Sequence, residues 1–174
     1  VFDDHRMEMD YERFFRPKFI NPALPLFPIP KRCPEAVAEE LRKASALYWS
    51  DTGSCANRLR SAVEALLTEQ KVVRYTTDKN GKRVPLTLHS RIDKFRAKDA
   101  HSAEMLLAIK WLGNAGSHAN LDALSADNVL DGFDLFEHVV ERIYANRDKA
   151  MKRLATKITS RKGKPAKAKK RSLS

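Results

Sequence analysis

Four segments of this sequence carry apolar residues at the spacing of one α-helix face, and this pattern constrains the fold more than any other feature. They begin near Pro34, Ser54, Asp99 and Ser125, residue types that favour the first turn or the N-cap of a helix. Because each apolar stripe must be buried against another element, four such helices with short joins predict a helical bundle. The apolar positions are Val37, Leu41, Ala44 and Tyr48, then Cys55, Leu59, Ala62, Val63, Leu66 and Leu67, then Met105, Leu106, Ile109 and Leu112, and finally Val129, Leu130, Phe133, Phe136, Val139, Val140, Ile143 and Tyr144.

The periodicity changes between the second and third of these helices. Residues 72–77 and 83–88 are rich in β-prone residues, and Asn80-Gly81 between them is a strong hairpin signal. Pro85 limits the second arm to a sheet edge. Residues 90–98 follow as a short helix, and residues 147–158 continue the last long helix. The predicted fold class is therefore mainly all-α, a four-helix bundle with a small inserted β-hairpin.

The segment before the bundle is rich in proline. Residues 17–34 hold six prolines interleaved with apolar side chains, so an extended strap is expected. We expect the strap to lie along the helical core, and the alternative is that its apolar side chains contact a dimer partner. The sequence thus divides into an N-terminal arm and strap over residues 1–33, a bundle domain over 34–158 and a tail over 159–174.

Positive charge is concentrated at the C-terminal end. Of the net charge of +11, the last part of the chain carries eight positive charges and no acidic residue. Such a low-complexity segment is predicted to be disordered, and it can bind RNA or DNA without sequence preference. The alternative is a solvated tail that only keeps the chain in solution. The charges belong to Lys157, Arg161, Lys162, Lys164, Lys167, Lys169, Lys170 and Arg171.

Several classes of protein are excluded by what the sequence lacks. No apolar run approaches the roughly 18 residues of a spanning helix, so no membrane association is expected. The N-terminus shows no signal peptide, which favours the cytoplasm, although a chain that begins with Val1 can be a fragment. Cys33 and Cys55 lack metal-ligand spacing, and Cys55 falls on a buried helix face. Without a glycine-rich phosphate loop or a catalytic triad pattern, neither a metal nor a cofactor is expected.

One short stretch carries a resemblance to a known family. Residues 108–118 read Ala-Ile-Lys-Trp-Leu-Gly-Asn-Ala-Gly-Ser-His. This stretch resembles the signature of domain-of-unknown-function family 4145, in which a helix ends in a Leu-Gly-Asn turn followed by a small residue and a histidine. The earlier helix, with Asn57-Arg58 and its Val-Glu-Ala-Leu-Leu run, and the proline strap are also similar to the family. The resemblance covers roughly residues 20–146.

The resemblance implies a fold like that of the HEPN superfamily of helical bundles. Many HEPN proteins are metal-independent ribonucleases that act across a homodimer with an Arg-Asn-x3-His motif. Asn114 and His118 match the second half of that motif, whereas Gly113 occupies the arginine position. Histidine suits proton transfer near pH 7, but glycine supplies no cation for the developing charge. Lys110, about one helical turn earlier, could supply a point charge in its place.

Two interpretations of this turn are open. In the structural one, the helix stops at Gly113 with positive φ, Asn114 and His118 bond exposed backbone ends, and Trp111 packs beneath. In the functional one, Lys110, Asn114 and His118 bind a phosphate of a nucleotide or nucleic acid.

In the functional interpretation, an arginine of the second predicted helix also contributes to the site. Arg58 or Arg60 would point towards His118 and restore the missing cation. In the alternative, Arg60 pairs with Glu64 four residues later on the same helix. His89, His101 and His138 show no ligand spacing and are expected at the surface.

Three hypotheses about function follow. The first is a non-catalytic binding module, homodimeric and associated with nucleic acid or nucleotide, which the resemblance links to a partner protein of bacterial restriction or anti-phage defence. The second is a metal-independent ribonuclease that uses Asn114 and His118. The third is a structural dimerisation unit whose tail anchors nucleic acid.

Overall fold

The chain forms a succession of helices interrupted by one short hairpin, as the sequence predicts. The computed structural model describes residues 17–117, 124–145, 147–160 and 162. The elements are α1 (Glu35–Leu47), α2 (Thr52–Glu69), β1 (Tyr75–Thr77), β2 (Arg83–Pro85), α3 (Leu88–Arg96), α4 (Ala100–Ala115), α5 (Ala126–Val140), a π-helical turn η1 (Glu141–Ala145) and α6 (Arg147–Ser160).

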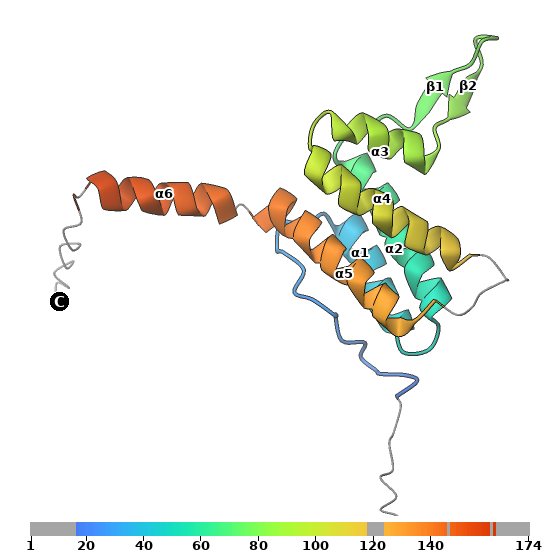
Figure 1. Cartoon of the computed structure of the whole chain (residues 1–174), viewed down its shortest axis with the longest axis horizontal. Helices are drawn as coiled ribbons and strands as arrows, with labels where there is room; N and C mark the ends of the chain where they lie inside the picture. Colours follow the sequence, from blue (N-terminus) through green and yellow to red (C-terminus); the bar gives the residue numbers. More distant parts are fainter. Residues whose placement is uncertain (1–16, 118–123, 146, 161, 163–174) are drawn as a thin grey trace, which may run out of the picture.

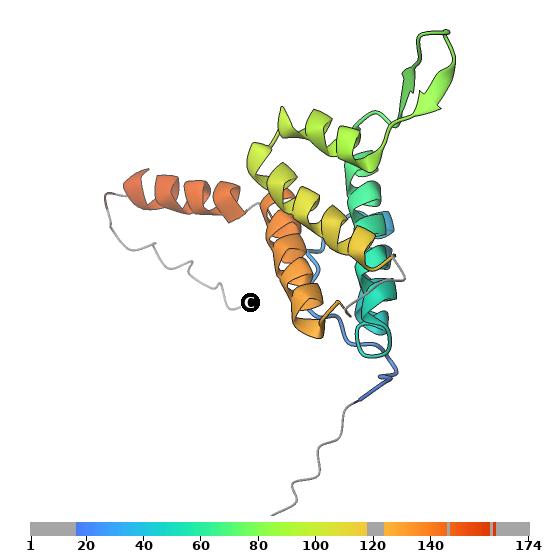
Figure 2. The same ribbon diagram turned by 45° about the vertical axis from the view of Figure 1, so that its right-hand side comes forward.

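The helices α1, α2, α4 and α5 form the bundle (Figure 1). The longest of them, α2, packs against both α1 and α4, and α5 contacts α2 and α4. The short α3 packs on α4 near the end of α2 (Figure 2). Their apolar stripes meet in one core, and each fully buried side chain of this size stabilises the fold by about 1.5–3 kcal/mol. The largest buried side chains are Phe95, Phe136, Leu41, Leu59, Leu66, Leu67, Ile92, Leu106 and Ile109.

Four helices begin at a side-chain cap, which satisfies backbone N–H groups that have no partner within the helix. Asp99 and Ser125 cap α4 and α5 as predicted, and Thr87 caps α3. The second helix differs from the prediction because Asp51, not Ser54, is its cap. The Asp51 carboxylate accepts hydrogen bonds from the Ser54 backbone N–H at 2.9 Å and from the Ser54 hydroxyl at 2.6 Å.

The hairpin stands at the end of α2, beyond the bundle (Figure 2). Its strands pair in antiparallel fashion from Tyr75 opposite Pro85 to Thr77 opposite Arg83, and Gly81 in the turn has a φ of +77°. The Asn-Gly prediction is confirmed, but each strand is only three residues long. The predicted short helix is also confirmed, and it begins earlier than expected, at Leu88.

The second half of the proline strap lies along the bundle, as expected. Phe27 is buried, and its ring stands edge-on to Phe133 of α5, with centroids 6.3 Å apart. The Leu26 N–H lies 3.4 Å from the Ser45 hydroxyl oxygen, which accepts its hydrogen bond. Phe19 and Leu24, earlier in the strap, remain exposed. The strap is therefore anchored from Leu26 onward.

The last helix, α6, extends away from the bundle (Figures 1 and 2). Residues 151–160 are all exposed, including the apolar Met151, Leu154 and Ile158. The predicted continuation of the last long helix is confirmed and reaches Ser160, after the π-helical turn. Within the ranges that the structure describes, no helix has the length and apolarity needed to cross a membrane.

Candidate functional site

The signature stretch lies where α4 crosses α2, and Gly113 is one of two glycines, with Gly116, at which α4 lies close to α2. The expectation that the helix stops at Gly113 with positive φ is wrong, because α4 runs through this residue to Ala115. A Cβ at position 113 would stand 2.5 Å from the Cβ of Arg60 and 3.0 Å from the carbonyl oxygen of Ala56. Glycine is needed here for helix packing, a tertiary requirement that no local pattern in the sequence reveals.

Arg60 therefore lies directly beside the position where the resemblance expects an arginine. Its Cδ would be 3.1 Å from a Cβ at position 113, so its aliphatic stem passes across Gly113. One of its guanidinium nitrogens lies 3.4 Å from the Glu64 carboxylate, which is the predicted pair. Its Nε is buried and has no hydrogen-bond partner among the described residues. The structure thus brings the aliphatic stem of Arg60 against the signature helix, while its guanidinium pairs with Glu64 of its own helix.

Lys110 and Trp111 form a second feature of the same helix. Lys110 is 9% exposed, and its Nζ lies 3.4 Å from the centroid of the Trp111 ring. Trp111 itself is 57% exposed, so the expectation that it packs beneath the turn is wrong. The reason is helical geometry, since the buried face of α4 carries Leu106, Ile109 and Gly113, and position 111 falls outside it.

The turn after α4 is described only in part. The Asn114 carbonyl accepts a hydrogen bond from the Ser117 N–H at 3.0 Å, and the Ser117 hydroxyl donates to the Gly113 carbonyl at 3.0 Å. The Asn114 side chain is half-buried. His118 lies outside the described residues, so the predicted Asn114 and His118 pair stays a prediction. Lys162 is described and exposed, and the other predicted tail residues, Arg161, Lys164, Lys167, Lys169, Lys170 and Arg171, also lie outside the described residues.

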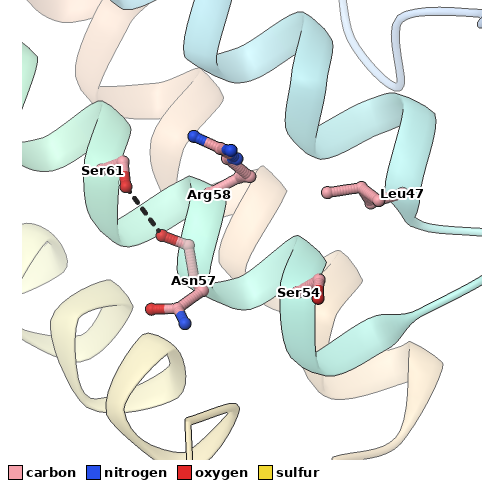
Figure 3. Close-up of a pocket in the computed structure, with 5 residues that line it drawn as sticks. All are labelled: Leu47, Ser54, Asn57, Arg58 and Ser61. Atoms are coloured by element: carbon pink, nitrogen blue, oxygen red, sulfur yellow. Dashed lines mark hydrogen bonds between the residues drawn. The ribbon is translucent and has the colours of Figure 1, made fainter.

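Arg58 points to a different face of α2 from Arg60. It lines a cavity of about 470 Å³ with Leu47, Ser54, Asn57 and Ser61, at the junction with α1 (Figure 3). The Ser61 hydroxyl donates to the Asn57 carbonyl oxygen at 3.2 Å within this lining. The structure therefore separates the two arginines that the sequence reasoning had grouped.

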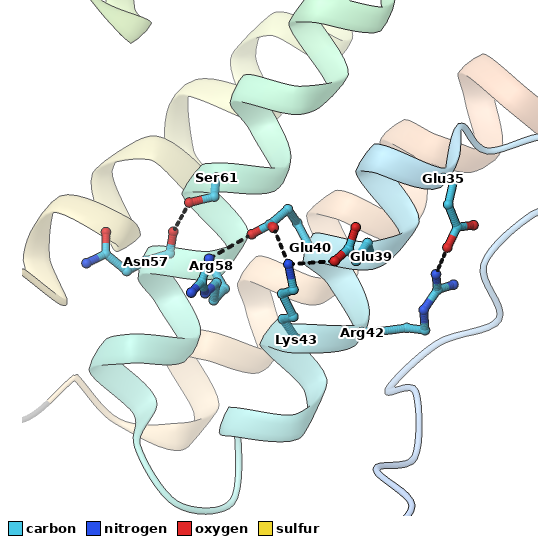
Figure 4. A network of polar contacts seen from close by, with 8 residues as sticks. All are labelled: Glu35, Glu39, Glu40, Arg42, Lys43, Asn57, Arg58 and Ser61. Atoms are coloured by element: carbon cyan, nitrogen blue, oxygen red, sulfur yellow. Dashed lines mark hydrogen bonds and ion pairs between the residues drawn. The ribbon is translucent and has the colours of Figure 1, made fainter.

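The charge of Arg58 is already balanced by α1. Its guanidinium lies 3.2 Å from the Glu40 carboxylate, which also contacts Lys43 at 3.0 Å (Figure 4). Lys43 in turn lies 2.8 Å from Glu39, and the Glu39 interaction raises the pKa of Lys43. Because this network pairs positive with negative groups on the surface, it offers an incoming anion little attraction.

A buried cation that the sequence reasoning missed lies on α3. Arg91 is 6% exposed and falls on the same helix face as Leu88, Ile92 and Phe95. Its guanidinium donates to the Thr68 hydroxyl at 2.9 Å and to the Glu64 carbonyl oxygen at 3.4 Å. The signal was present in the sequence, because a charged residue at a position where the helical period requires an apolar one is unusual.

The histidines and cysteines do not assemble a reactive centre in the described part of the chain. His89, His101 and His138 are exposed as expected, and the rings of His101 and His138 meet edge-on at 5.4 Å. Cys33 and Cys55 are free thiols, and Cys55 is buried as predicted. Within the described residues, no group of three His, Cys, Asp or Glu side chains could hold a metal ion.

These features define a class of protein: a mainly helical bundle with an inserted hairpin, whose second and fourth helices cross at a glycine beside an arginine. Residues 42–161 match the model of the family described as Domain of unknown function (DUF4145). The match covers more than half of the chain, which belongs to this family. The match starts within α1 and extends through α6. Comparison with curated proteins and with solved structures gave no match.

Proposed function

We propose that the chain is a non-catalytic binding module that takes a phosphate-bearing ligand, either nucleic acid or nucleotide, at the C-terminal half of α4. The single observation that carries this proposal is the exposed Trp111 ring with the Lys110 ammonium 3.4 Å from its centroid. An exposed aromatic ring stacks on nucleobases and contributes about 1–3 kcal/mol per base. A lysine beside the ring supplies positive charge for the adjoining phosphate.

The neighbouring side chains support the same assignment. Arg60, whose stem crosses Gly113, supplies a cation from α2, and Asn114 adds amide donors and acceptors one turn after Lys110. His118 completes the proposed site, and the basic tail adds sequence-independent attraction. The family resemblance extends the proposal to a homodimer that accompanies a partner protein in bacterial restriction or anti-phage defence.

The absence of an arginine at position 113 favours binding over catalysis. The space beside Gly113 is filled by the stem of Arg60, and the Arg60 guanidinium shares its charge with Glu64. A cation held by a carboxylate gives less stabilisation to the charge that develops on phosphoryl oxygens in a transition state.

The proposal is tested by fluorescence anisotropy with labelled single-stranded RNA and DNA, at about 50 and about 200 mM salt. We compare the full chain, a chain ending at Ile158, and the Trp111→Ala and Lys110→Ala variants. Trp111→Ala is expected to weaken binding by the truncated chain about tenfold. Lys110→Ala is expected to weaken binding to all sequences and to reduce the salt slope by about one.

Lys94→Ala is the matched control, because Lys94 is an exposed lysine of α3 outside the site. It removes the same charge and is expected to leave affinity unchanged. Loss of all binding on truncation at Ile158 would instead support the third hypothesis, in which the tail is the anchor and the bundle only a scaffold.

The position of Arg60 favours a second candidate, a metal-independent ribonuclease. In that case Arg60 supplies from α2 the cation that the signature lacks, and His118 transfers the proton. Cleavage of RNA in the presence of EDTA, abolished in both His118→Ala and Arg60→Ala, is the expected result for this candidate. Undiminished cleavage by either variant, or no cleavage by the full chain, rejects it.

A further inference from the structure

A second cavity lies between α2, the hairpin and the start of α3, away from Trp111. Its volume is about 290 Å³, and its polar lining comprises Arg60, Glu64, Arg74, Thr87 and Arg91. Figure 2 shows why these residues converge: the hairpin rises from the end of α2 and returns into α3 beside it. Three guanidinium groups from three separate parts of the chain therefore line one cavity.

Arg91 holds a buried positive charge without a carboxylate partner in the described part of the chain. Both of its side-chain hydrogen bonds go to neutral oxygens, those of the Thr68 hydroxyl and the Glu64 carbonyl. Its Nε is buried and unpaired there. Burial lowers the pKa of Arg91, and the positive charge of Arg74 lowers it further. The nearby Glu64 carboxylate opposes these two effects without outweighing them. Since arginine stays protonated in proteins, the buried charge remains and is only partly compensated.

Arg74 and Arg60 add two more positive charges to the lining. Arg74 is exposed and makes no side-chain hydrogen bond or ion pair with any described residue. Glu64, the carboxylate of the lining, pairs with Arg60 at 3.4 Å. Within this lining, three cations thus share one carboxylate, an excess of two positive charges. Arg74 and Arg91 also border a neighbouring cavity, which is lined by Glu39, Glu40 and Glu69.

Two further features of the lining suit an anion. Thr87 and Leu88, the cap and first residue of α3, border the cavity, and helix N-termini attract negative charge. Arginine forks bind tetrahedral oxyanions through paired N–H donors, which lysine cannot do.

We propose that this cavity binds a phosphate group, either inorganic phosphate or the terminal phosphate of a nucleotide. A phosphate monoester carries close to two negative charges at pH 7, which matches the excess charge of the lining. The cavity is at the small end of ligand sites, so it accommodates the phosphate and little more of the molecule that carries it. The inference differs from the Trp111 site because it requires neither base stacking nor α4, and Arg60 is the one residue assigned to both.

The test is thermal unfolding of the full chain in a titration with inorganic phosphate, against sodium chloride at matched ionic strength. A ligand that binds only the folded state raises Tm with its concentration. The diagnostic variant is Arg74→Gln, because Arg74 is exposed and unpaired among the described residues, so its loss does not disturb the core. Lys82→Gln is the control, with the same charge change on an exposed hairpin residue outside the lining.

We expect phosphate, but not chloride, to raise the Tm of the full chain and of Lys82→Gln. Arg74→Gln should require at least about tenfold more phosphate for the same shift, as for loss of a charge-assisted contact. The same titration is repeated with adenosine monophosphate. If adenosine monophosphate binds more tightly than inorganic phosphate, the site is assigned to a phosphate ester, and if both bind equally, it is assigned to the free ion. No shift beyond that of chloride, or equal shifts in Arg74→Gln and Lys82→Gln, overturns the proposal.

Discussion

At the scale of single residues, the chain depends on glycine where two helices cross. Gly113 lets α4 lie against Ala56 and Arg60, and Gly116 lies one turn later against Gly53, whose carbonyl oxygen a Cβ would meet at 2.5 Å. Alanine is the better helix former, so glycine inside α4 carries a cost in helix propensity. Close packing offsets that cost, and it also holds the Arg60 stem in place.

Gly113→Ala is expected to lower the free energy of unfolding by about 1–2 kcal/mol. Overpacking costs about 1–3 kcal/mol, and the gain in helix propensity returns up to about 1 kcal/mol. Urea unfolding measures the change. The double variant with Arg60→Gly removes the nearest atom, so Gly113→Ala should cost less in that background. An equal cost in both backgrounds would show that Arg60 is not the obstacle.

The two thiols give the stability a pH dependence above neutrality. Burial raises the pKa of Cys33 to about 11 and that of Cys55 to about 12, from a usual value of 9.0. Cys55 also donates its S–H to the Ala44 carbonyl oxygen at 3.1 Å. The unfolded thiols ionise first, so their contribution is fully present below pH 9 and is lost as pH rises towards these higher values.

The measurement for this prediction compares the wild-type chain with Cys55→Ala by urea unfolding between pH 8 and pH 11, the range just around the usual thiol pKa. The wild-type chain should lose stability faster above pH 9, with a difference in slope that approaches 1.4 kcal/mol per pH unit, about the value for one proton. Parallel curves would show that Cys55 ionises in the folded state as readily as in the unfolded one.

At the scale of elements, the starts of α2, α3, α4 and α5 share one feature, a short polar side chain whose oxygen accepts from the backbone N–H three residues on. Asp51 with Ser54 and Asp99 with Ser102 are two copies of the same arrangement. The Asp99 carboxylate also accepts from Arg142 of η1 at 2.9 Å, so it joins the start of α4 to the end of α5. Burial acts to raise the pKa of Asp99, but the bonds from Ser102 and Arg142 outweigh it and lower the pKa.

Asp99→Ala is expected to reduce stability at pH 7 by about 1–2 kcal/mol, the cost of a lost cap and ion pair. Asp99→Asn keeps a capping oxygen and loses only the charge, so it should cost less. Because the pKa of Asp99 is lowered on folding, its contribution is present above about pH 4 and lost as pH falls below it. Unfolding curves at pH 7 and pH 3 should show the Asn variant and the wild-type chain converging at the lower pH. A gap of unchanged size at pH 3 would contradict the role of the charge.

The elements themselves were readable from the sequence, whereas their exact ends and the candidate site were not. The period of the apolar residues predicts α1, α2, α4 and α5, and Asn80-Gly81 predicts the hairpin, because both signals are local. The sequence predicts the end of α4 too early, because a glycine near the end of an apolar helix pattern usually indicates a helix stop. The glycine at position 113 is explained instead by its contact with Arg60. Arg74 and Arg91 meet through the path of the hairpin, which no spacing along the chain encodes.

At the scale of the whole molecule, the bundle ends structurally before α6 begins. Tyr144 of η1 is half-buried, and its hydroxyl accepts a hydrogen bond from Gln70 at 3.1 Å. From residue 151 to 160, by contrast, all side chains are exposed. The stability of the bundle should therefore be independent of α6.

A chain ending at Ala145 is expected to keep its Tm within about 2 °C, because the side chains of residues 151–160, which it loses, are all exposed. A chain ending at Val140 also loses Ile143 and Tyr144, which pack against the core, and its Tm should fall by several degrees more. Differential scanning calorimetry of the two truncated chains measures both values. A large fall already at Ala145 would show that α6 docks on the bundle or on a second copy.

The hairpin is attached to the bundle by ends that are specified independently of it. α2 finishes with its own backbone bonds, from Gln70 and Val72 to Leu66 and Leu67, and α3 starts at its own cap, Thr87. The segment between them can therefore be replaced without any change to the residues that end α2 or start α3. Arg74 lies on that segment and faces the arginines of the bundle across the cavity. The bundle can thus stay constant in evolution and in engineering, while exchange of one short insert alters the lining of this cavity.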